Sequence, residues 1–209
     1  MSEDVENFDN PLPVRSPSGE TVTVSAMSRP ILFAPHNDDE TLFASFLCLR
    51  HAPVVVVCYR SKVQEANGIT ADERQAETSC AVAHLGVPAW HQWPWHDSEL
   101  NADGIEGNMW GMLDPMSDDK PLVFAPAWHA KGHPQHNLVA DLADMVFGKE
   151  HVIHYTTYLL GGPRHVAKEV IFDPAWIAPK LSALACYRSQ TERGPNRMWL
   201  DFGLREYVT

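Results

Sequence analysis

The chain has 209 residues, of which 44% are hydrophobic and 21% charged, a composition typical of a globular domain with ample material for a core. Its formal net charge of −11 at pH 7 argues against a nucleic-acid partner, because phosphate binding needs a basic surface. The amino terminus lacks the basic-then-apolar pattern of a signal peptide, and no apolar run is long enough to span a membrane, so we expect a cytoplasmic protein.

The first 28 residues differ from the rest of the chain. They are polar, contain Pro11, Pro13 and Pro17, and show no sustained hydrophobic period. We expect residues 1–28 to form an amino-terminal tail, open to disorder, or a loosely docked arm, and residues 29–209 to form a single domain.

Beyond this arm, apolar runs typical of buried strands alternate with helical patterns. The clearest strand is the β-branched run at residues 52–60, which lacks polar alternation, as a parallel strand covered on both faces does. Strands are expected at residues 29–34, 52–60, 89–95, 121–126, 151–160, 167–173 and, at an edge, 196–208. Helices are expected at residues 41–51, 69–87, 137–147 and 175–190, and residues 96–108 are expected to be an exposed loop. This order predicts an α/β fold with a Rossmann-like, mostly parallel sheet flanked by helices, and a ligand site at the carboxyl ends of the strands.

The four cysteines, Cys48, Cys58, Cys80 and Cys186, are isolated within apolar segments, and no CxxC pair occurs. We therefore expect reduced, buried core residues rather than a disulfide framework or a thiolate zinc site.

Two polar clusters follow predicted strands, at residues 36–40 and 129–136, so both should face the same crevice at the sheet edge. His36 and Asp39 are three residues apart, as are His133 and His136, so each pair can converge as the chain enters a helix. Such a set can supply a three-ligand zinc site with an open fourth position, although iron(II) or cobalt would suit the same donors. The alternative is that the acidic residues only cap a helix and that the histidines are ordinary surface residues.

The segment "APHNDDE" closely resembles the AHPDDE motif of the PIG-L/LmbE-like zinc-dependent N-acetylglucosaminyl deacetylases. "HPQH" at residues 133–136 resembles the HPDH motif of that family, and "ERQAETSCAVAHLGV" resembles its R-x-x-E helix, with Arg74 and Glu77 in the motif positions. "HDSEL" and "KLSALACYRSQ" resemble its later segments, so the likeness runs in order from about residue 30 to residue 190.

The resemblance implies a role for several residues of this chain. His36, Asp39 and His136 would hold one Zn²⁺, and Asp38 would be the general base. His133 would assist the tetrahedral intermediate or protonate the leaving amine. Arg74 and Asp97 would contact sugar hydroxyls; for Arg74 the alternative is a surface ion pair with Glu77 or Asp72.

Three positions depart from the family pattern. Asn37 replaces a proline, and Gln135 replaces the aspartate of HPDH, which would lower the pKa of His133 and weaken its role as an acid. Lys131 stands where some relatives have a tyrosine, and its cation could stabilise an oxyanion, with His129 close by.

Tryptophans gather around the predicted strand ends. Trp95 and Trp128 lie nearest the polar motifs and could stack on a sugar ring, although large aromatic residues more often belong to the core. The polar segment 60–73 could cover the site as a lid.

The sequence thus predicts a zinc-dependent hydrolase that removes an N-acyl group, most simply acetyl, from a small amino sugar or its conjugate. The alternatives are a metal-dependent hydratase or lyase and a non-catalytic sugar-binding module. The main sequence feature in favour of the module is Gln135 in place of aspartate, and the presence of Asp38 speaks against it. No nucleic-acid or membrane partner is expected, and the sequence leaves a homo-oligomer open.

Overall fold

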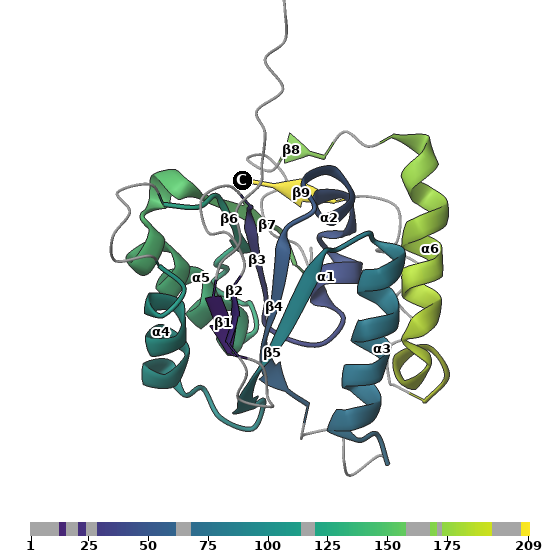
Figure 1. Cartoon of the computed structure of the whole chain (residues 1–209), viewed down its shortest axis with the longest axis horizontal. Helices are drawn as coiled ribbons and strands as arrows, with labels where there is room; N and C mark the ends of the chain where they lie inside the picture. Colours follow the sequence, from purple (N-terminus) through teal and green to yellow (C-terminus); the bar gives the residue numbers. More distant parts are fainter. Residues whose placement is uncertain are drawn as a thin grey trace, which may run out of the picture.

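A seven-stranded sheet forms the centre of the molecule, with the strand order β5-β4-β3-β6-β7-β9-β8 (Figure 1). The computed structural model describes residues 13–15, 21–23, 29–61, 68–113, 120–157, 168–170, 173–193 and 206–209. Its strands are β3 Ile31–Ala34, β4 Val54–Arg60, β5 Ala89–His96, β6 Val123–Pro126, β7 Val152–Tyr155, β8 Lys168–Glu169 and β9 Tyr207–Val208. Strands β3 to β7 are parallel, whereas β9 pairs antiparallel with β7 and β8. The predicted α/β fold with a mostly parallel sheet is therefore confirmed.

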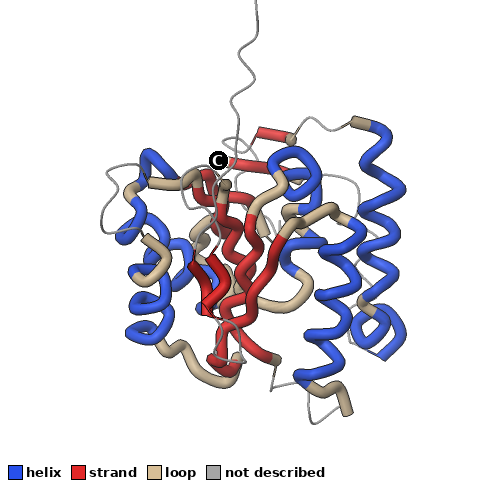
Figure 2. Tube along the Cα trace, in the orientation of Figure 1, coloured by secondary structure: helices blue, strands red, loops and turns tan. Residues whose placement is uncertain are grey.

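Helices cover both faces of this sheet (Figures 1 and 2). One face carries α1 Asp39–Leu42, α2 Ser45–His51, α3 Ala71–His84 and α6 Ile177–Cys186, and the other carries α4 Ala102–Trp110 and α5 Pro134–Phe147. Short turns of helix occur at η2 Lys149–His151, η3 Pro174–Trp176 and η4 Ser189–Arg193. None of the described helices is both long and apolar enough to cross a membrane.

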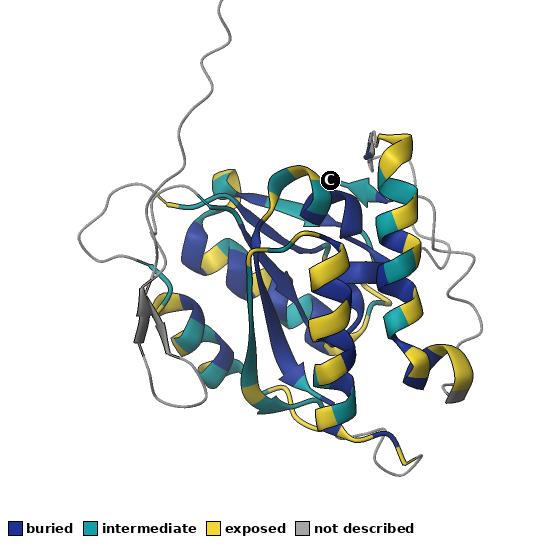
Figure 3. Ribbon diagram, turned by 45° about the vertical axis from the view of Figure 1, so that its right-hand side comes forward, coloured by how far each residue is buried: buried dark blue, intermediate teal, exposed yellow. Residues whose placement is uncertain are grey.

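The two faces of the sheet build two separate cores. Leu32 and Val55 point into the core beneath α2, α3 and α6, whereas Ile31 and Val54 point into the core beneath α4 and α5. Both faces are therefore covered, which is why the strands read as unbroken apolar runs. Figure 3 shows the central strands buried and the outer sides of α3 and α6 exposed.

Three element predictions were wrong. The segment 196–208 was expected to be an edge strand, but its β9 lies between β7 and β8, and residues 196–205 lie outside the described residues. The helix expected at residues 41–51 is interrupted at Phe43 and Ala44, so α1 is a single turn before α2 begins. The segment expected to be an exposed loop contains α4, whose Ile105 and Met109 lie one turn apart and are both buried against the sheet. The two glycines and some of the polar residues of α4 have low helix propensity, so the sequence pattern indicated a loop and not a helix with a short apolar stripe.

The start of α3 agrees with the sequence. The Thr70 side chain accepts a hydrogen bond from the Glu73 amide, and Gly86 takes a positive φ of 65° just beyond the helix.

In the expected amino-terminal arm, β1 Pro13–Arg15 pairs antiparallel with β2 Thr21–Thr23. The remaining residues of the expected arm, 1–12, 16–20 and 24–28, lie outside the described residues. Residues 62–67 of the segment expected to form a lid also lie outside them.

The prediction for the cysteines was half wrong. Cys48 and Cys58 are free and buried, as expected, but Cys80 on α3 forms a disulfide with Cys186 at the end of α6. The two are 106 residues apart in the chain, so their sequence surroundings give no sign that the antiparallel packing of α3 and α6 brings them together.

A buried ion pair joins the carboxyl-terminal segment to this layer of helices. Lys180 Nζ lies 2.6 Å from Glu206 Oε1, and both side chains are fully buried. Glu206 also accepts hydrogen bonds from the Ser45 hydroxyl and the Phe46 amide, which satisfies the rest of its carboxylate. The strand β9 is thereby held against α2 and α6.

Replacing Lys180 with methionine should destabilise the fold strongly, because the Glu206 carboxylate would stay buried without its cation. We expect a loss of about 3–5 kcal/mol in the free energy of unfolding, measured by urea denaturation. Arg188→Ala, which breaks the exposed pair with Glu192, is the matched control and should change this free energy little. Equal effects of the two variants would contradict the role given to the buried pair.

Candidate metal centre

The loop after β3 holds an unusual backbone conformation at the carboxyl edge of the sheet. Asp38 has a positive φ of 122°, which is rare for a residue with a side chain. Its amide donates to Glu40 Oε2 at 3.1 Å, and the Arg74 guanidinium donates to the carbonyl of Asn37. Such strain persists where surrounding contacts enforce it, and it is common at functional sites.

Three donor atoms converge beside this loop. Nδ1 of His36 lies 3.1 Å from Nε2 of His136, and Oδ2 of Asp39 lies 3.4 Å from the first and 3.2 Å from the second. A tetrahedral zinc ion with bonds of about 2.0–2.1 Å separates its ligands by about 3.3 Å. The spacing of the three atoms therefore fits one such cation, and Oδ1 of Asp39 is buried without a hydrogen-bond partner among the described residues.

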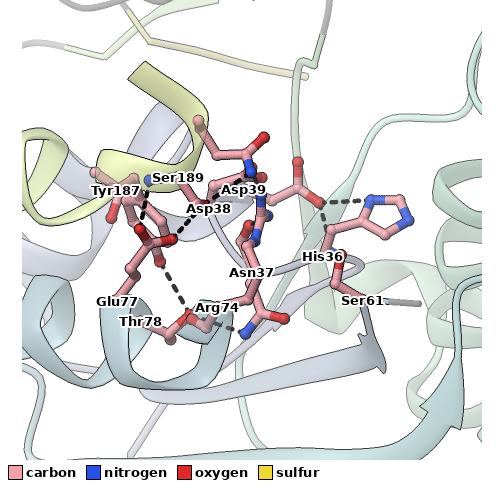
Figure 4. Close-up of polar contacts among 12 residues, drawn as sticks. His36, Asn37, Asp38, Asp39, Ser61, Arg74, Glu77, Thr78, Tyr187 and Ser189 are labelled. Carbon is pink, nitrogen blue, oxygen red and sulfur yellow. Dashed lines mark hydrogen bonds and ion pairs between the residues drawn. The ribbon is translucent and has the colours of Figure 1, made fainter. Parts of the chain in front are cut away.

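Each of these ligands is oriented by a further contact. Nδ1 of His136 lies 3.2 Å from the Thr157 hydroxyl. Asp39 Oδ2 accepts the backbone amide of His36 at 2.8 Å (Figure 4). Burial opposes ionisation of Asp39, but the charges and hydrogen bonds of His136 and His36 outweigh it and lower its pKa. A carboxylate that stays ionised between two imidazoles is well suited to a divalent cation.

Gln135 fixes the tautomer of His36. Its side-chain amide donates to the carbonyls of Asp97 at 3.0 Å and Glu99 at 2.8 Å, so its oxygen is left to accept from Nε2 of His36 at 2.7 Å. The proton of His36 therefore sits on Nε2, and the lone pair of Nδ1 points at the other two donors. From the sequence we linked Gln135 to the pKa of His133; its side chain instead supports His36, and neither motif spacing nor composition signals this contact.

His133 lies beside the three donors and caps α5. Its Nδ1 accepts a hydrogen bond from the backbone amide of Gln135 at 3.3 Å. Its ring centre is 5.0 Å from that of His36 and 5.4 Å from that of His136. The nearest ring nitrogens of His36, His133 and His136 all lie within 4.8 Å of one another, so His133 could also serve as a ligand. Burial, reinforced by the two neighbouring imidazoles, lowers the pKa of His133 to about 4, so it is neutral at pH 7.

Asp38 lies on the other side of the loop and is paired with a cation. Arg74 Nη2 lies 2.7 Å from Asp38 Oδ2, and the Arg74 side chain is only 2% exposed (Figure 4). Burial raises the pKa of Asp38 to about 8, although Arg74 opposes this shift. The surface ion pair considered for Arg74 does not match its burial, and Asp72 pairs with Arg60 instead.

A second layer behind the loop joins it to α3 and α6. The Tyr187 hydroxyl contacts Glu40 and, at 3.1 Å, the hydroxyl of Thr78, while Glu77 accepts the amide and hydroxyl of Ser189 (Figure 4). Sequence reasoning missed the contacts of Tyr187 and Thr157 with the site, because they lie far from the motifs in the chain.

The other residues expected at the site lie on its rim or behind it. Asp97 accepts from the Ser61 hydroxyl at 3.4 Å, and Trp128, His129 and Lys131 lie in the turn between β6 and α5, where Trp128 is 56% exposed. Trp95 packs against α4: a Cβ added at Gly104 would come within 2.6 Å of its ring. Its geometry is that of a packing residue.

Replacing Gln135 with leucine should weaken metal binding about 10–100-fold, because His36 would lose the acceptor that fixes its tautomer. Competition with a chromogenic zinc chelator measures this affinity in the absence of any substrate. Asn137→Leu on the same helix is the matched control, since among the described residues that amide bonds the backbone of His129 rather than a metal ligand, and the affinity should stay close to wild type. An unchanged affinity in Gln135→Leu would refute the role of Gln135.

A family match covers the part of the chain that carries these motifs. The family described as PIG-L, GlcNAc-PI de-N-acetylase, matches residues 31–147, which is more than half of the chain. No curated protein sequence matches significantly.

Solved structures of low sequence identity share the fold. The A40926 pseudoaglycone deacetylase Dbv21 is 15% identical with a TM-score of 0.65, covering 86% of this chain and 95% of its own. The conserved protein TT1542 of Thermus thermophilus is 19% identical with a TM-score of 0.62, covering 83% and 84%. The N,N′-diacetylchitobiose deacetylase of Pyrococcus horikoshii is 17% identical with a TM-score of 0.60, covering 85% and 74%. The family match confirms the resemblance of the motifs within residues 31–147, and this chain therefore belongs to the PIG-L family.

Proposed function

We propose that this protein is a zinc-dependent N-deacetylase that acts on an amino sugar or its conjugate. The observation that carries the proposal is the triangle of His36 Nδ1, Asp39 Oδ2 and His136 Nε2, with sides of 3.1–3.4 Å, at the carboxyl edge of the sheet. Membership of the PIG-L family and likeness in fold to two deacetylases support the reaction class. Two nitrogens and one oxygen favour zinc, although iron(II) and cobalt also accept such ligands.

The residues around the triangle have separate roles in the proposed reaction. A bound divalent cation would lower the pKa of a water molecule and polarise the amide carbonyl of the substrate. Asp38 accepts the proton of the attacking water, and Arg74 holds its carboxylate in position. Burial raises the pKa of Asp38 to about 8, and the charge of a bound divalent cation would lower it again and favour the ionised carboxylate.

His133 and Lys131 stabilise the negative charge that develops on the carbonyl oxygen of the substrate. His133 is neutral at pH 7, and its Nδ1 is engaged by the Gln135 amide, so Nε2–H is its free donor. A donor at this position stabilises negative charge that develops on the carbonyl oxygen, and the exposed Lys131 can add its charge. Proton delivery to the leaving amine then falls to the protonated Asp38, because a neutral His133 with a pKa of about 4 is a poor proton source at pH 7.

The sugar would lie on the rim. Asp97 follows β5 and the turn that carries Trp128 and His129 follows β6, on opposite sides of β3 in the sheet, and Trp128 offers an exposed aromatic face. Arg74 and Trp95 then act from behind this rim, the first by fixing Asp38 and the second by packing on α4.

The metal content of the purified protein tests the centre. With the Cys80–Cys186 disulfide intact, we expect about one zinc ion per chain by mass spectrometry, lost on dialysis against a chelator and lost in Asp39→Ala and His136→Ala. Asp141→Ala, an exposed carboxylate on α5, should keep the ion. A protein that stays metal-free after zinc is supplied and the excess removed would refute the proposal.

The role of Asp38 is tested by release of acetate from N-acetylglucosamine and N,N′-diacetylchitobiose. Asp38→Asn should lower turnover about 10²–10⁴-fold while zinc content is kept, because the amide cannot accept the proton. Asp144→Asn, the same change at a carboxylate that pairs with His154 outside the site, should leave turnover near wild type. Full turnover in Asp38→Asn would exclude Asp38 as the base, and no acetate from any N-acetylated sugar would leave the hydratase or binding alternatives.

A further inference from the structure

Away from the candidate metal centre, a second group of potential ligands lies between α3 and α6. Cys80 and His84 are one turn apart on α3, and Cys186 is the last residue of α6. The sulfurs of the two cysteines and a ring nitrogen of His84 all lie within 4.8 Å of one another. Cys80 and His84 are exposed and Cys186 is half-buried, so solvent and small solutes can reach the cluster.

The donor set differs in kind from that of the candidate metal centre. Two thiolates and one imidazole form a soft set of the type that binds zinc and other thiophilic cations, with three protein ligands and one open position. A purely structural disulfide would need neither the imidazole nor its place beside both sulfurs.

We propose that Cys80, His84 and Cys186 form a second metal site, which is available when the Cys80–Cys186 disulfide is reduced and closed when it forms. The disulfide engages both sulfurs with each other and so withholds two of the three ligands. In the reduction, two low-molecular-weight thiols deliver two electrons and two protons to the sulfur–sulfur bond and become one disulfide, which leaves Cys80 and Cys186 as thiols. Binding of one Zn²⁺ then releases both thiol protons to solvent.

The same helix positions can serve both states. The Cα atoms of the two cysteines are 5.9 Å apart. Two thiolates on one zinc ion lie about 3.8 Å apart, given zinc–sulfur bonds of about 2.3 Å. The two sulfurs therefore have to move apart when the disulfide is reduced and zinc binds. Rotation of the two accessible side chains can increase the sulfur–sulfur distance in this way without moving the helices. In the reverse direction, a low-molecular-weight disulfide takes up the two electrons, becomes two thiols and re-forms the Cys80–Cys186 bond.

Cobalt titration of the purified chain distinguishes the two sites. Thiolate ligands give an intense near-ultraviolet charge-transfer band with Co²⁺, whereas the His36–Asp39–His136 set contains no sulfur. With the disulfide reduced by a phosphine, which takes oxygen from water to become a phosphine oxide, we expect this band together with one more bound ion per chain than in the oxidised protein. The band should be absent from the oxidised protein and from reduced Cys80→Ser/Cys186→Ser, and present in Asp39→Ala, so failure of one site is separable from failure of the other.

Two further measurements keep the proposal falsifiable if the double variant does not fold. His84→Ala retains both thiols and should keep the band but weaken Co²⁺ affinity about tenfold or more. In the reduced wild type, Zn²⁺ should slow alkylation of Cys80 and Cys186 by iodoacetamide, as followed by peptide mass spectrometry. A folded, reduced wild type that gains no band and no protection would overturn the proposal and leave a structural disulfide. A band that persists in Cys80→Ser/Cys186→Ser would assign the thiolate to Cys48 or Cys58 and overturn it equally.

Discussion

Three carboxylates, Asp38, Asp39 and Glu40, are buried side by side where β3 ends, and their desolvation is the constraint around which the surrounding structure is built. An unpaired buried carboxylate costs several kcal/mol or shifts its pKa until it is neutral. Asp38 is met by Arg74, Asp39 by His36 and His136, and Glu40 by hydroxyl groups and the amide of Asp38. Three different environments are thus produced for three adjacent residues.

These compensating partners come from elements that are distant in the sequence. Arg74 lies on α3, His136 on α5, and Tyr187 just beyond α6. The loop after β3 therefore contacts elements that cover both faces of the sheet. Burial raises the pKa of Glu40 even though the hydroxyls of Tyr187 and Thr41 oppose the shift, whereas Asp39 is held ionised by its imidazoles. The loop can therefore present one carboxylate as a ligand while its neighbour, paired with Arg74, faces a different target.

Sequence reasoning succeeded where the chain carries a local physical signal. The apolar runs of β3 and β4 and the cap at Thr70 could be read directly, because burial on both faces and capping each leave a pattern within a few residues. Spacing placed two histidine-containing clusters at strand ends, but only motif resemblance selected His36, Asp39 and His136, whose donor atoms the structure brings together. What could not be read was pairing across the chain: the Cys80–Cys186 bond and the Lys180–Glu206 ion pair depend on how α3, α6 and β9 pack.

Gln135 illustrates why a departure from a motif has to be judged in three dimensions. As a replacement for aspartate it suggested a weakened acid and lent support to a non-catalytic binding module. In the structure its buried side chain meets one N–H, from His36, and two backbone carbonyls, from Asp97 and Glu99. A primary amide, with one acceptor oxygen and two donor hydrogens, satisfies all three groups, whereas a carboxylate would face the two carbonyls with no hydrogen to donate. The substitution therefore fits the loop after β5 and orients a metal ligand, which removes the main sequence argument for a module without turnover.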